Sequence, residues 1–256
     1  MRRTTPNCSF IAEEQRKLLA SLGALDPGAV AGVLAEFVTA ERAARLRAVF
    51  EARVAAVTVV MDAPHDPHNG AAVIRSCDAF GVQHLHVVER LERFLAANSV
   101  ARGSERWVDV HTHPAVDDAV AALAASGHEL VATHPEGDLL PQDLAAIPRV
   151  ALVLGNERTG IAAHLRAACR HSVRIPMRGF AESLNVSVTA AILLQHATWS
   201  RPGDLSGQEK ERLYARALVL TVPHAAEILA HKGMRVDLPA GLAGDALPSA
   251  FGARAK

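Results

Sequence analysis

Short apolar runs alternate with amphipathic segments through the middle of this chain. Six runs predict strands, because each is too short for a helix and is bounded by residues that favour turns. They are Ala55–Met61, His84–Val88, Trp107–Val110, Glu129–Thr133, Val150–Leu154 and Ser172–Ile175. The segments between them predict helices at Gly70–Phe80, Asp117–Ala125, Gly160–Cys169 and Ser183–Trp199. Strands that alternate with helices and are apolar on both faces predict an α/β fold, a parallel sheet covered by helices on both faces.

Both flanks of this pattern predict helices. Residues 11–50 are rich in Ala, Leu, Glu and Arg and predict two helices, divided at Leu25–Gly28. Residues 206–232 predict a further helical segment, and a mobile tail rich in Gly, Pro and Ala follows from Asp237. We therefore expect a helical N-terminal extension (residues 1–54), a central domain (55–200), and a helical C-terminal extension with its tail (201–256).

The amino-acid composition excludes few classes of protein. The 256 residues are half apolar, which suffices for one good core with helical additions. Lys and Arg balance Asp and Glu at 27 each, so no global charge indicates nucleic acid. Residues 1–55 and 201–256 each carry a net charge of +2, and residues 56–200 carry −4. The flanks are therefore candidates for phosphate contacts, although ordinary scatter explains the same numbers.

The cysteines and the hydropathy of the chain indicate in which cellular compartment we expect the protein. The three cysteines are far apart and form no Cys-x-x-Cys pair, which argues against a zinc ribbon and fits a reducing environment. The chain shows neither the apolar segment of a secretory signal nor a run of about 18 apolar residues. We expect a cytoplasmic protein without a membrane partner.

Ligands of a parallel sheet bind beyond the carboxyl ends of its strands, which directs attention to four loops. These loops are residues 62–69, 134–141, 155–160 and 176–185. Gly155–Gly160 (GNERTG) follows a strand and opens a predicted helix, a suitable place for a ligand at a helix N-terminus. Its glycines have the spacing of a P-loop, but Ile161-Ala162 stands where Lys and Ser or Thr belong. A P-loop nucleotide hydrolase is therefore rejected, and no Gly-x-Gly-x-x-Gly is present to indicate a dinucleotide site.

The loop after the first strand is polar and contains two prolines. Its His65 and His68 are conceivable metal ligands, but no third ligand is apparent, so a turn is the better interpretation. Asn69 is the expected N-cap of the helix that follows.

Arg75 lies within that helix and admits two interpretations. It could pair with Asp78 or Glu89 at the helix surface, which spacing alone favours. Alternatively, it reaches back over the ends of the strands and acts on a ligand.

The most unusual stretch is Ile175–Thr189 (IPMRGFAESLNVSVT). A strand ends in proline, a loop containing Gly179 follows, and Ser183 or Asn185 caps a long apolar helix. The loop offers backbone groups that could bind an adenine, but a simple helix cap explains the same residues.

Together, these stretches resemble the three signature motifs of the TrmH (SpoU) family of SPOUT RNA 2′-O-ribose methyltransferases. The matching segments are DPHNGAAVIRSCDAFGV (Asp66–Val82), ALVLGNERTGI (Ala151–Ile161) and IPMRGFAESLNVSVTAAILLQHA (Ile175–Ala197). Their order and separation also match, and Ala101–His113 resembles the family's Gly-Ser-x-x-Trp-Val stretch. Residues 211–236 are similar to the C-terminal extension of bacterial tRNA (guanosine-18-2′-O)-methyltransferases.

The resemblance implies 2′-O-methylation of a ribose in RNA with S-adenosylmethionine as the donor, most closely at guanosine 18 in the D-loop of tRNA. A ribosomal RNA target and a non-catalytic RNA-binding module are the alternatives. It also implies a trefoil knot in the C-terminal half and a homodimer whose active sites each draw on both subunits.

The resemblance also implies roles for particular residues. Contacts to the cofactor would come from Thr133, Gly155, Ile175 and Leu184, with no metal required. Catalysis would centre on Arg75, which would position a substrate phosphate and accept or relay the proton of the 2′-hydroxyl. Around it would lie Asn69, Glu157, Ser183 and Asn185. The chain departs from the family at Gly70, where a small or hydrophobic residue is frequent, and a glycine there should cost some helix stability.

Overall fold

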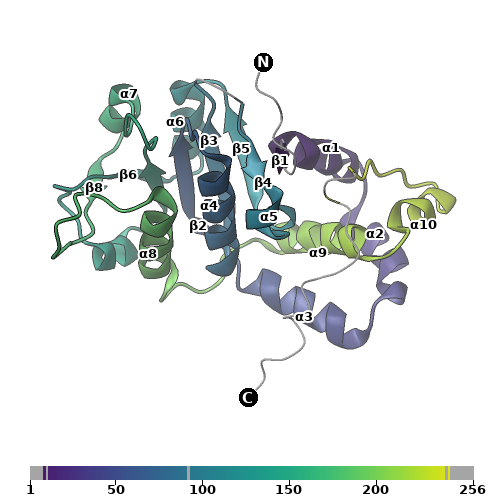
Figure 1. Cartoon of the computed structure of the whole chain (residues 1–256). Helices are drawn as coiled ribbons and strands as arrows, with labels where there is room; N and C mark the ends of the chain where they lie inside the picture. Colours follow the sequence, from purple (N-terminus) through teal and green to yellow (C-terminus); the bar gives the residue numbers. More distant parts are fainter. Residues whose placement is uncertain (1–7, 10, 91–92, 240–241, 243–256) are drawn as a thin grey trace. The chain divides into compact units, whose positions relative to one another are not determined.

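The computed structural model describes residues 8–9, 11–90, 93–239 and 242 (Figure 1). The start of the chain and most of the predicted tail lie outside these residues. The chain divides into two compact units, Met1–Ala12 with Arg53–Asp204 and Glu13–Ala52 with Leu205–Lys256. Each unit is therefore assembled from segments that are distant in the sequence.

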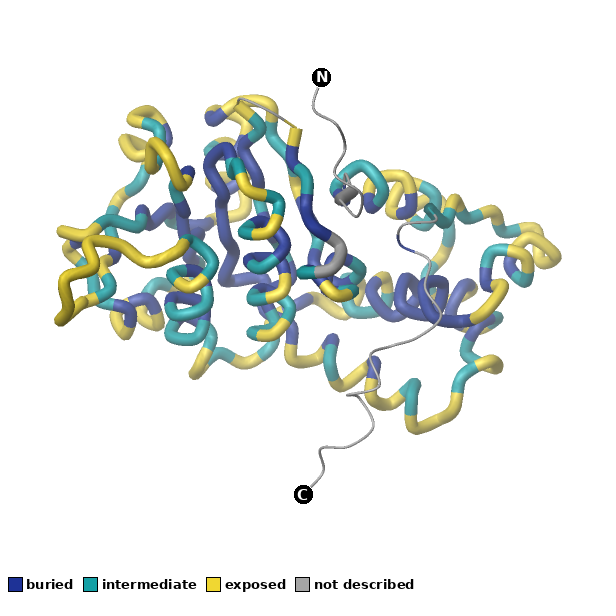
Figure 2. The backbone as a smooth tube through the Cα atoms, in the orientation of Figure 1, coloured by how far each residue is buried: buried dark blue, intermediate teal, exposed yellow. Residues whose placement is uncertain are grey.

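A six-stranded parallel sheet forms the centre of the first unit. In chain order its strands are β2 (Val54–Asp62), β3 (Val82–Val88), β5 (Asp109–His113), β6 (Glu129–Thr133), β7 (Val150–Leu154) and β8 (His171–Val173). Their spatial order is β5-β3-β2-β7-β6-β8, and all neighbours are parallel. Both β2 and β7 are buried along their whole length (Figure 2). The order of strands reverses between β2 and β7, which is where sheets of this kind bind their ligands.

Helices cover both faces of the sheet, as the alternating pattern predicts. α4 (Pro67–Ala79) and α8 (Val186–Thr198) pack together over the larger apolar core and lie on the near face in Figure 1. α6 (Val116–Ala125) and α7 (Ala163–Ala167) close the opposite face with a second core. The smaller elements of this unit are β1 (Cys8–Ser9), β4 (Ala96–Ala97), α5 (Asn98–Ala101), η2 (Ser104–Arg106) and η3 (Pro141–Ala146).

The second unit is helical. Its elements are α1 (Ile11–Gly23), whose first two residues belong to the first unit, α2 (Pro27–Leu34), η1 (Ala35–Phe37), α3 (Ala40–Glu51), α9 (Gly207–Thr221) and α10 (Ala225–His231). α9 is buried from Leu213 to Thr221, with α2, α3 and α10 packed against it. Within the described residues no single helix is long and apolar enough to cross a membrane. Two pairs of helices joined at a sharp bend, α1 with α2–η1 and α9 with α10, would be long and apolar enough if each pair is counted as one segment.

The predicted strands lie close to the observed ones, whereas several helix boundaries were wrong. Residues 11–50 contain three helices instead of two, because Thr39 begins α3 by accepting a hydrogen bond from the Arg42 N–H. The helix predicted from Gly160 begins only at Ala163 as α7. Gly160 instead adopts φ 67° and pairs with the backbone of Asn156, which turns the chain before the helix starts.

The start of α4 also differs from the prediction. Asp66 caps this helix by accepting a hydrogen bond from the His68 N–H (2.9 Å), and Pro67 is the first helical residue. Asn69 is therefore not the N-cap, and its side chain remains available for other contacts. A Cβ at Gly70 would lie 2.6 Å from Cε2 of Phe94, so the glycine allows a close approach of that ring. From the sequence we expected only a cost in helix stability at Gly70; the packing of Phe94 against this glycine was not expected.

Four histidines line one face of the β3–β5 edge. Nδ1 of His84 lies 3.1 Å from Nε2 of His111, and Nδ1 of His86 lies 2.9 Å from Nε2 of His113. The rings of His86 and His113 stack with their centroids 5.2 Å apart. Each nitrogen pair needs one donor and one acceptor, which neutral imidazoles supply. Burial, followed by the neighbouring histidines, lowers the pKa of His86 to about 2 and that of His111 to about 4.

Candidate functional site

A pocket of about 610 Å³ opens at the carboxyl edge of the sheet, within the first unit. Each of the four loops that the sequence singles out contributes at least one residue to its wall. The pocket has the volume and the mixed apolar and polar lining of sites that hold small organic ligands. Eight of the predicted site residues line it: Asn69, Thr133, Gly155, Glu157, Ile175, Ser183, Leu184 and Asn185.

One wall is a tight turn after β7. The backbones of Asn156 and Gly160 exchange two hydrogen bonds, of 3.0 and 2.9 Å. A Cβ at Gly155 would lie 2.6 Å from the carbonyl carbon of Gly160 and 2.7 Å from the amide nitrogen of Ile161. Only glycine therefore fits at this position, and the wall consists of backbone groups that can bind a ligand directly.

Asn156 fixes this turn to the loop after β2. Its side-chain amide donates to the carbonyl oxygen of Ala63, and its Oδ1 accepts from the Arg158 N–H at 2.8 Å. Ala63 itself has a positive φ of 47°, which is uncommon for a residue with a Cβ. Sequence reasoning missed Asn156, although an asparagine directly after a strand-end glycine is a frequent turn former.

A chain of side-chain amides and a carboxylate connects the three predicted motifs. Nδ2 of Asn69 donates to Oε1 of Glu157 at 2.9 Å, and Nδ2 of Asn185 donates to Oδ1 of Asn69 at 3.0 Å. Asn185 also caps α8, because its Oδ1 accepts from the Ser187 N–H at 2.8 Å. Residues 69, 157 and 185 therefore form one hydrogen-bonded network although they are far apart in the sequence.

Glu157 is ionised in this network. Burial by itself would raise the pKa of the Glu157 carboxyl. Hydrogen bonds from the Asn69 side chain and from backbone N–H groups, including that of His65, outweigh this effect and lower the pKa below its usual value. Glu157 is thus a fixed negative charge and acceptor at the pocket.

Apolar side chains form another part of the pocket lining. They are those of Leu154, Val173, Ile175 and Leu184, and Leu184 is 37% exposed. The hydroxyl of Thr133 donates to the carbonyl oxygen of Val153 at 3.1 Å, inside the sheet. The hydrogen of the Thr133 hydroxyl is therefore used within the sheet, and its oxygen can still accept a hydrogen bond.

Arg75 is the one predicted site residue that does not line the pocket. It is exposed on α4, the helix that carries Asn69. Asp78 instead pairs with Arg53, and Glu89 accepts from the Phe94 N–H at 2.7 Å. The first of the two interpretations, a surface pair with Asp78 or Glu89, is therefore wrong, and Arg75 forms no ion pair with any residue that the structure describes.

The described residues contain no group of three or more His, Cys, Asp or Glu side chains placed to hold a metal ion. His68 lies in the first turn of α4 instead of in a loop turn, with its Nδ1 3.2 Å from Oδ1 of Asp66.

The sequence profile described as the SpoU rRNA Methylase family matches residues 56–195, a range that contains the whole pocket lining. The chain belongs to this family.

Individual members of the SpoU family show how close the relationship is. Over 161 residues the chain is 37% identical to tRNA (guanosine(18)-2′-O)-methyltransferase of Escherichia coli strain K12, which spans 62% of this chain and 70% of the relative. It is 32% identical over 143 residues to 23S rRNA (guanosine-2′-O-)-methyltransferase RlmB of Coxiella burnetii, spanning 54% of this chain and 56% of the relative. A solved structure of a TrmH/SpoU tRNA modifying enzyme of A. aeolicus aligns with a TM-score of 0.62 at 28% identity, covering 70% of this chain and 95% of the other.

Proposed function

We propose that this protein methylates the 2′-oxygen of a ribose in RNA with S-adenosylmethionine as the donor, and that its target is guanosine 18 of tRNA. The observation that carries the proposal is the pocket in which the three family motifs meet through Asn69, Glu157 and Asn185. The choice of target is supported by the 37% identity to a tRNA (guanosine(18)-2′-O)-methyltransferase. A ribosomal RNA target is the second candidate, favoured by the similarity to a 23S rRNA enzyme.

The pocket suits S-adenosylmethionine in its chemistry. Apolar side chains, Ile175 and Leu184 among them, offer surfaces for an adenine ring, and the backbone around Gly155 offers hydrogen-bonding groups. We propose that Thr133, Gly155, Ile175 and Leu184 hold the cofactor. When bound, S-adenosylmethionine supplies an electrophilic methyl group, so the remaining task of the protein is to prepare the 2′-hydroxyl.

Arg75 is our candidate for that task. Its exposed guanidinium can position a backbone phosphate of the RNA through two parallel hydrogen bonds. In the proposed mechanism it also accepts or relays the proton of the 2′-hydroxyl as the oxygen attacks the methyl group. Asn69, Glu157, Ser183 and Asn185 would hold the ribose and the neighbouring backbone in position. Of these, Asn69 lies on the same helix as Arg75.

The proposal also covers the domain boundaries, the chain topology and the oligomeric state. We assign the methyltransferase domain to residues 55–200 and largely helical extensions to residues 1–54 and 201–256, with Met1–Ala12 belonging to the same compact unit as the domain. We also propose a trefoil knot in the C-terminal half and a homodimer. The position of Arg75 outside the pocket of its own chain supports the dimer, because a second copy could bring an arginine to that pocket.

The test is methyl transfer from labelled S-adenosylmethionine to unmodified tRNA and unmodified ribosomal RNA in parallel, with nucleoside mapping of the product. We expect label in 2′-O-methylguanosine at position 18 of tRNA. Label only in ribosomal RNA would keep the chemistry and replace the target. No label in either RNA, with the cofactor still bound, would favour a non-catalytic RNA-binding module.

A further inference from the structure

The loop between β6 and η3 lies along the edge strand β8. The His134 N–H donates to the Val173 carbonyl (3.0 Å), the Leu139 N–H to that of Ser172 (2.9 Å), and the Arg174 N–H to that of Leu139 (3.0 Å). A Cβ at Gly137, within this loop, would come as close as 2.6 Å to the β8 backbone. The loop is therefore held to β8 at close range.

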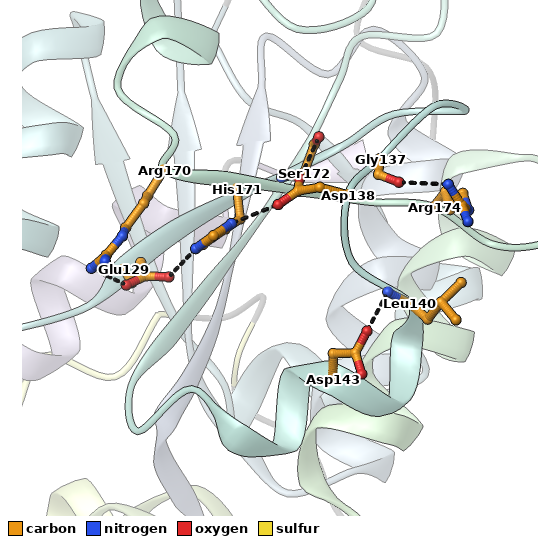
Figure 3. Close-up of polar contacts among 9 residues, drawn as sticks. All are labelled: Glu129, Gly137, Asp138, Leu140, Asp143, Arg170, His171, Ser172 and Arg174. Atoms are coloured by element: carbon orange, nitrogen blue, oxygen red, sulfur yellow. Dashed lines mark hydrogen bonds and ion pairs between the residues drawn. The ribbon is translucent and has the colours of Figure 1, made fainter.

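Asp138 adds a side-chain contact to this pairing. Its Oδ1 accepts from the Ser172 N–H (2.7 Å) and from the Ser172 hydroxyl (3.0 Å), and its Oδ2 lies 2.6 Å from Nδ1 of His171 (Figure 3). A carboxylate only accepts, so Nδ1 of His171 carries the hydrogen. On the other side of the ring, Nε2 lies 3.8 Å from Oε1 of Glu129. The Asp138 carboxylate thus accepts three hydrogen bonds from two consecutive residues of β8.

Hydrogen bonds keep this carboxylate ionised at neutral pH. The backbone N–H of Ser172, followed by the ring of His171, holds the pKa of Asp138 well below its usual range. The contact between Asp138 and β8 therefore persists at neutral pH.

The two segments joined by Asp138 form neighbouring parts of the pocket wall. His134 and Pro135 come from the loop, and Val173 and Ile175 come from the end of β8 and the residue pair after it. Asp138 itself does not line the pocket. Because exposed polar contacts contribute little to global stability, its main effect should be on the spacing of these two walls.

We propose that Asp138, with Ser172 and His171 as its partners, is a positioning residue for the pocket: it fixes the loop of residues 134–139 on β8 at the distance that S-adenosylmethionine requires. This inference rests on the proposed function.

The experiment compares Asp138→Ala, Asp138→Asn and, as a matched control, Glu136→Gln, an exposed acidic residue of the same loop. Binding of S-adenosylhomocysteine is measured by calorimetry, and kcat and KM are measured with saturating tRNA. For Asp138→Ala we expect the Kd and the KM for S-adenosylmethionine to rise about 5- to 30-fold. kcat at saturation and the KM for tRNA should stay near those of the unsubstituted protein. Asp138→Asn should recover most of the affinity, because an amide oxygen still accepts from Ser172.

Unchanged affinity in Asp138→Ala, or an equal loss in Glu136→Gln, would overturn the inference while leaving the proposed function intact. A fall in kcat at normal affinity would overturn it too. If Asp138→Ala does not fold, Ser172→Ala removes the hydroxyl contact and should raise the Kd for S-adenosylhomocysteine, and normal affinity in that variant would count against the proposal. Failure of the unsubstituted protein to bind S-adenosylhomocysteine would instead overturn the proposed function.

Discussion

Arg75 and Asn69 belong to one helix but not to one face of it. Six positions separate them, which corresponds to about 9 Å along an α-helix and a rotation of about 240°. Asn69 lines the pocket beside Glu157, whereas Arg75 is exposed to solvent. A group that is exposed and pairs with no described residue is well placed to meet a phosphate brought by the RNA.

Arg75→Ala should therefore abolish methyl transfer and leave cofactor affinity unchanged. Arg75→Lys should fail as well, because an ammonium group lacks the planar fork that binds a phosphate through two hydrogen bonds. Single-turnover methylation of tRNA and calorimetric binding of S-adenosylhomocysteine separate the two properties. Arg166→Ala, a change at another exposed arginine of the same unit, serves as the control. Near-normal kcat in Arg75→Ala would exclude the role proposed for it.

Gly155 sets the shape of the pocket by the absence of a side chain. In Gly155→Ala the new methyl group would meet backbone atoms 2.6–2.9 Å away, and backbone cannot move aside as a flexible side chain can. We expect a loss of cofactor affinity of at least about tenfold and a destabilisation of about 1–3 kcal/mol. Calorimetry and urea unfolding would measure these effects. Gly207→Ala, where nothing lies within 4 Å of the new Cβ, should leave cofactor affinity unchanged and should not destabilise the protein.

Single residues also show where sequence reasoning reached its limit. Asn69, Glu157 and Asn185 could be singled out because they stand in motifs that resemble those of a known family. Asp138 could not, because its partners His171 and Ser172 lie 33 and 34 residues further along the chain. Contacts of this kind depend on which loop lies beside which strand, and local sequence carries no signal of that.

Among the secondary-structure elements, strand β5 depends most on the protonation of its side chains. His111 and His113 of β5 contact His84 and His86 of β3, and each contact needs one nitrogen without a hydrogen, so at least one ring of each pair must be neutral. The pKa of His86 is lowered to about 2 by burial and then by the other histidines, so the folded state resists protonation more than the unfolded chain, whose pKa is about 6.5. Stability is therefore complete above pH 6.5 and is lost as the pH falls below that value. Asp109 and Asp118, which face this cluster, oppose the effect only in part.

We predict that the free energy of unfolding falls by about 1–3 kcal/mol between pH 7 and pH 5.5. Urea titrations at several pH values would measure it. His86→Gln should make the curve flatter, because one group that must remain neutral is gone. His231→Gln, at an exposed histidine of α10, should leave the curve as it is. A pH dependence that is identical in all three proteins would contradict this account of the β3–β5 edge.

The boundaries of some strands were predicted correctly from the sequence, whereas those of two helices were not, and each outcome has a physical reason. β6 and β7 match the prediction at both ends. β7 is buried and apolar throughout, whereas β6 is buried only at its three central residues and carries polar residues at both ends. α7 was predicted too long, because the left-handed backbone at Gly160 closes a turn that composition does not reveal. α3 was missed as a separate helix for a similar reason, since its boundary depends on one capping hydroxyl, that of Thr39.

At the scale of the molecule, the proposed dimer makes a prediction about mixed subunits. If Arg75 of one copy serves the pocket of another, Arg75→Ala and Gly155→Ala subunits should complement each other. One of the two sites in each mixed dimer would combine an intact pocket with an intact arginine. After denaturation and refolding of an equal mixture, about a quarter of the normal activity should return.

The control for this experiment is each variant refolded alone and assayed at a cofactor concentration well below the Kd of Gly155→Ala, where each should show little activity. Continued inactivity of the mixture, with dimers shown by analytical ultracentrifugation, would mean that Arg75 serves the pocket of its own chain.

The strand order has a consequence for synthesis on the ribosome. β2, β3 and β5 can pair as soon as they emerge, but β6 pairs only with β7 and β8, which are made later. A nascent chain that ends near residue 145 therefore carries one strand without a partner and one open edge on β2. Because open strand edges invite wrong pairing, this stage is the one at which a chaperone would be most useful and a pause in translation most harmful.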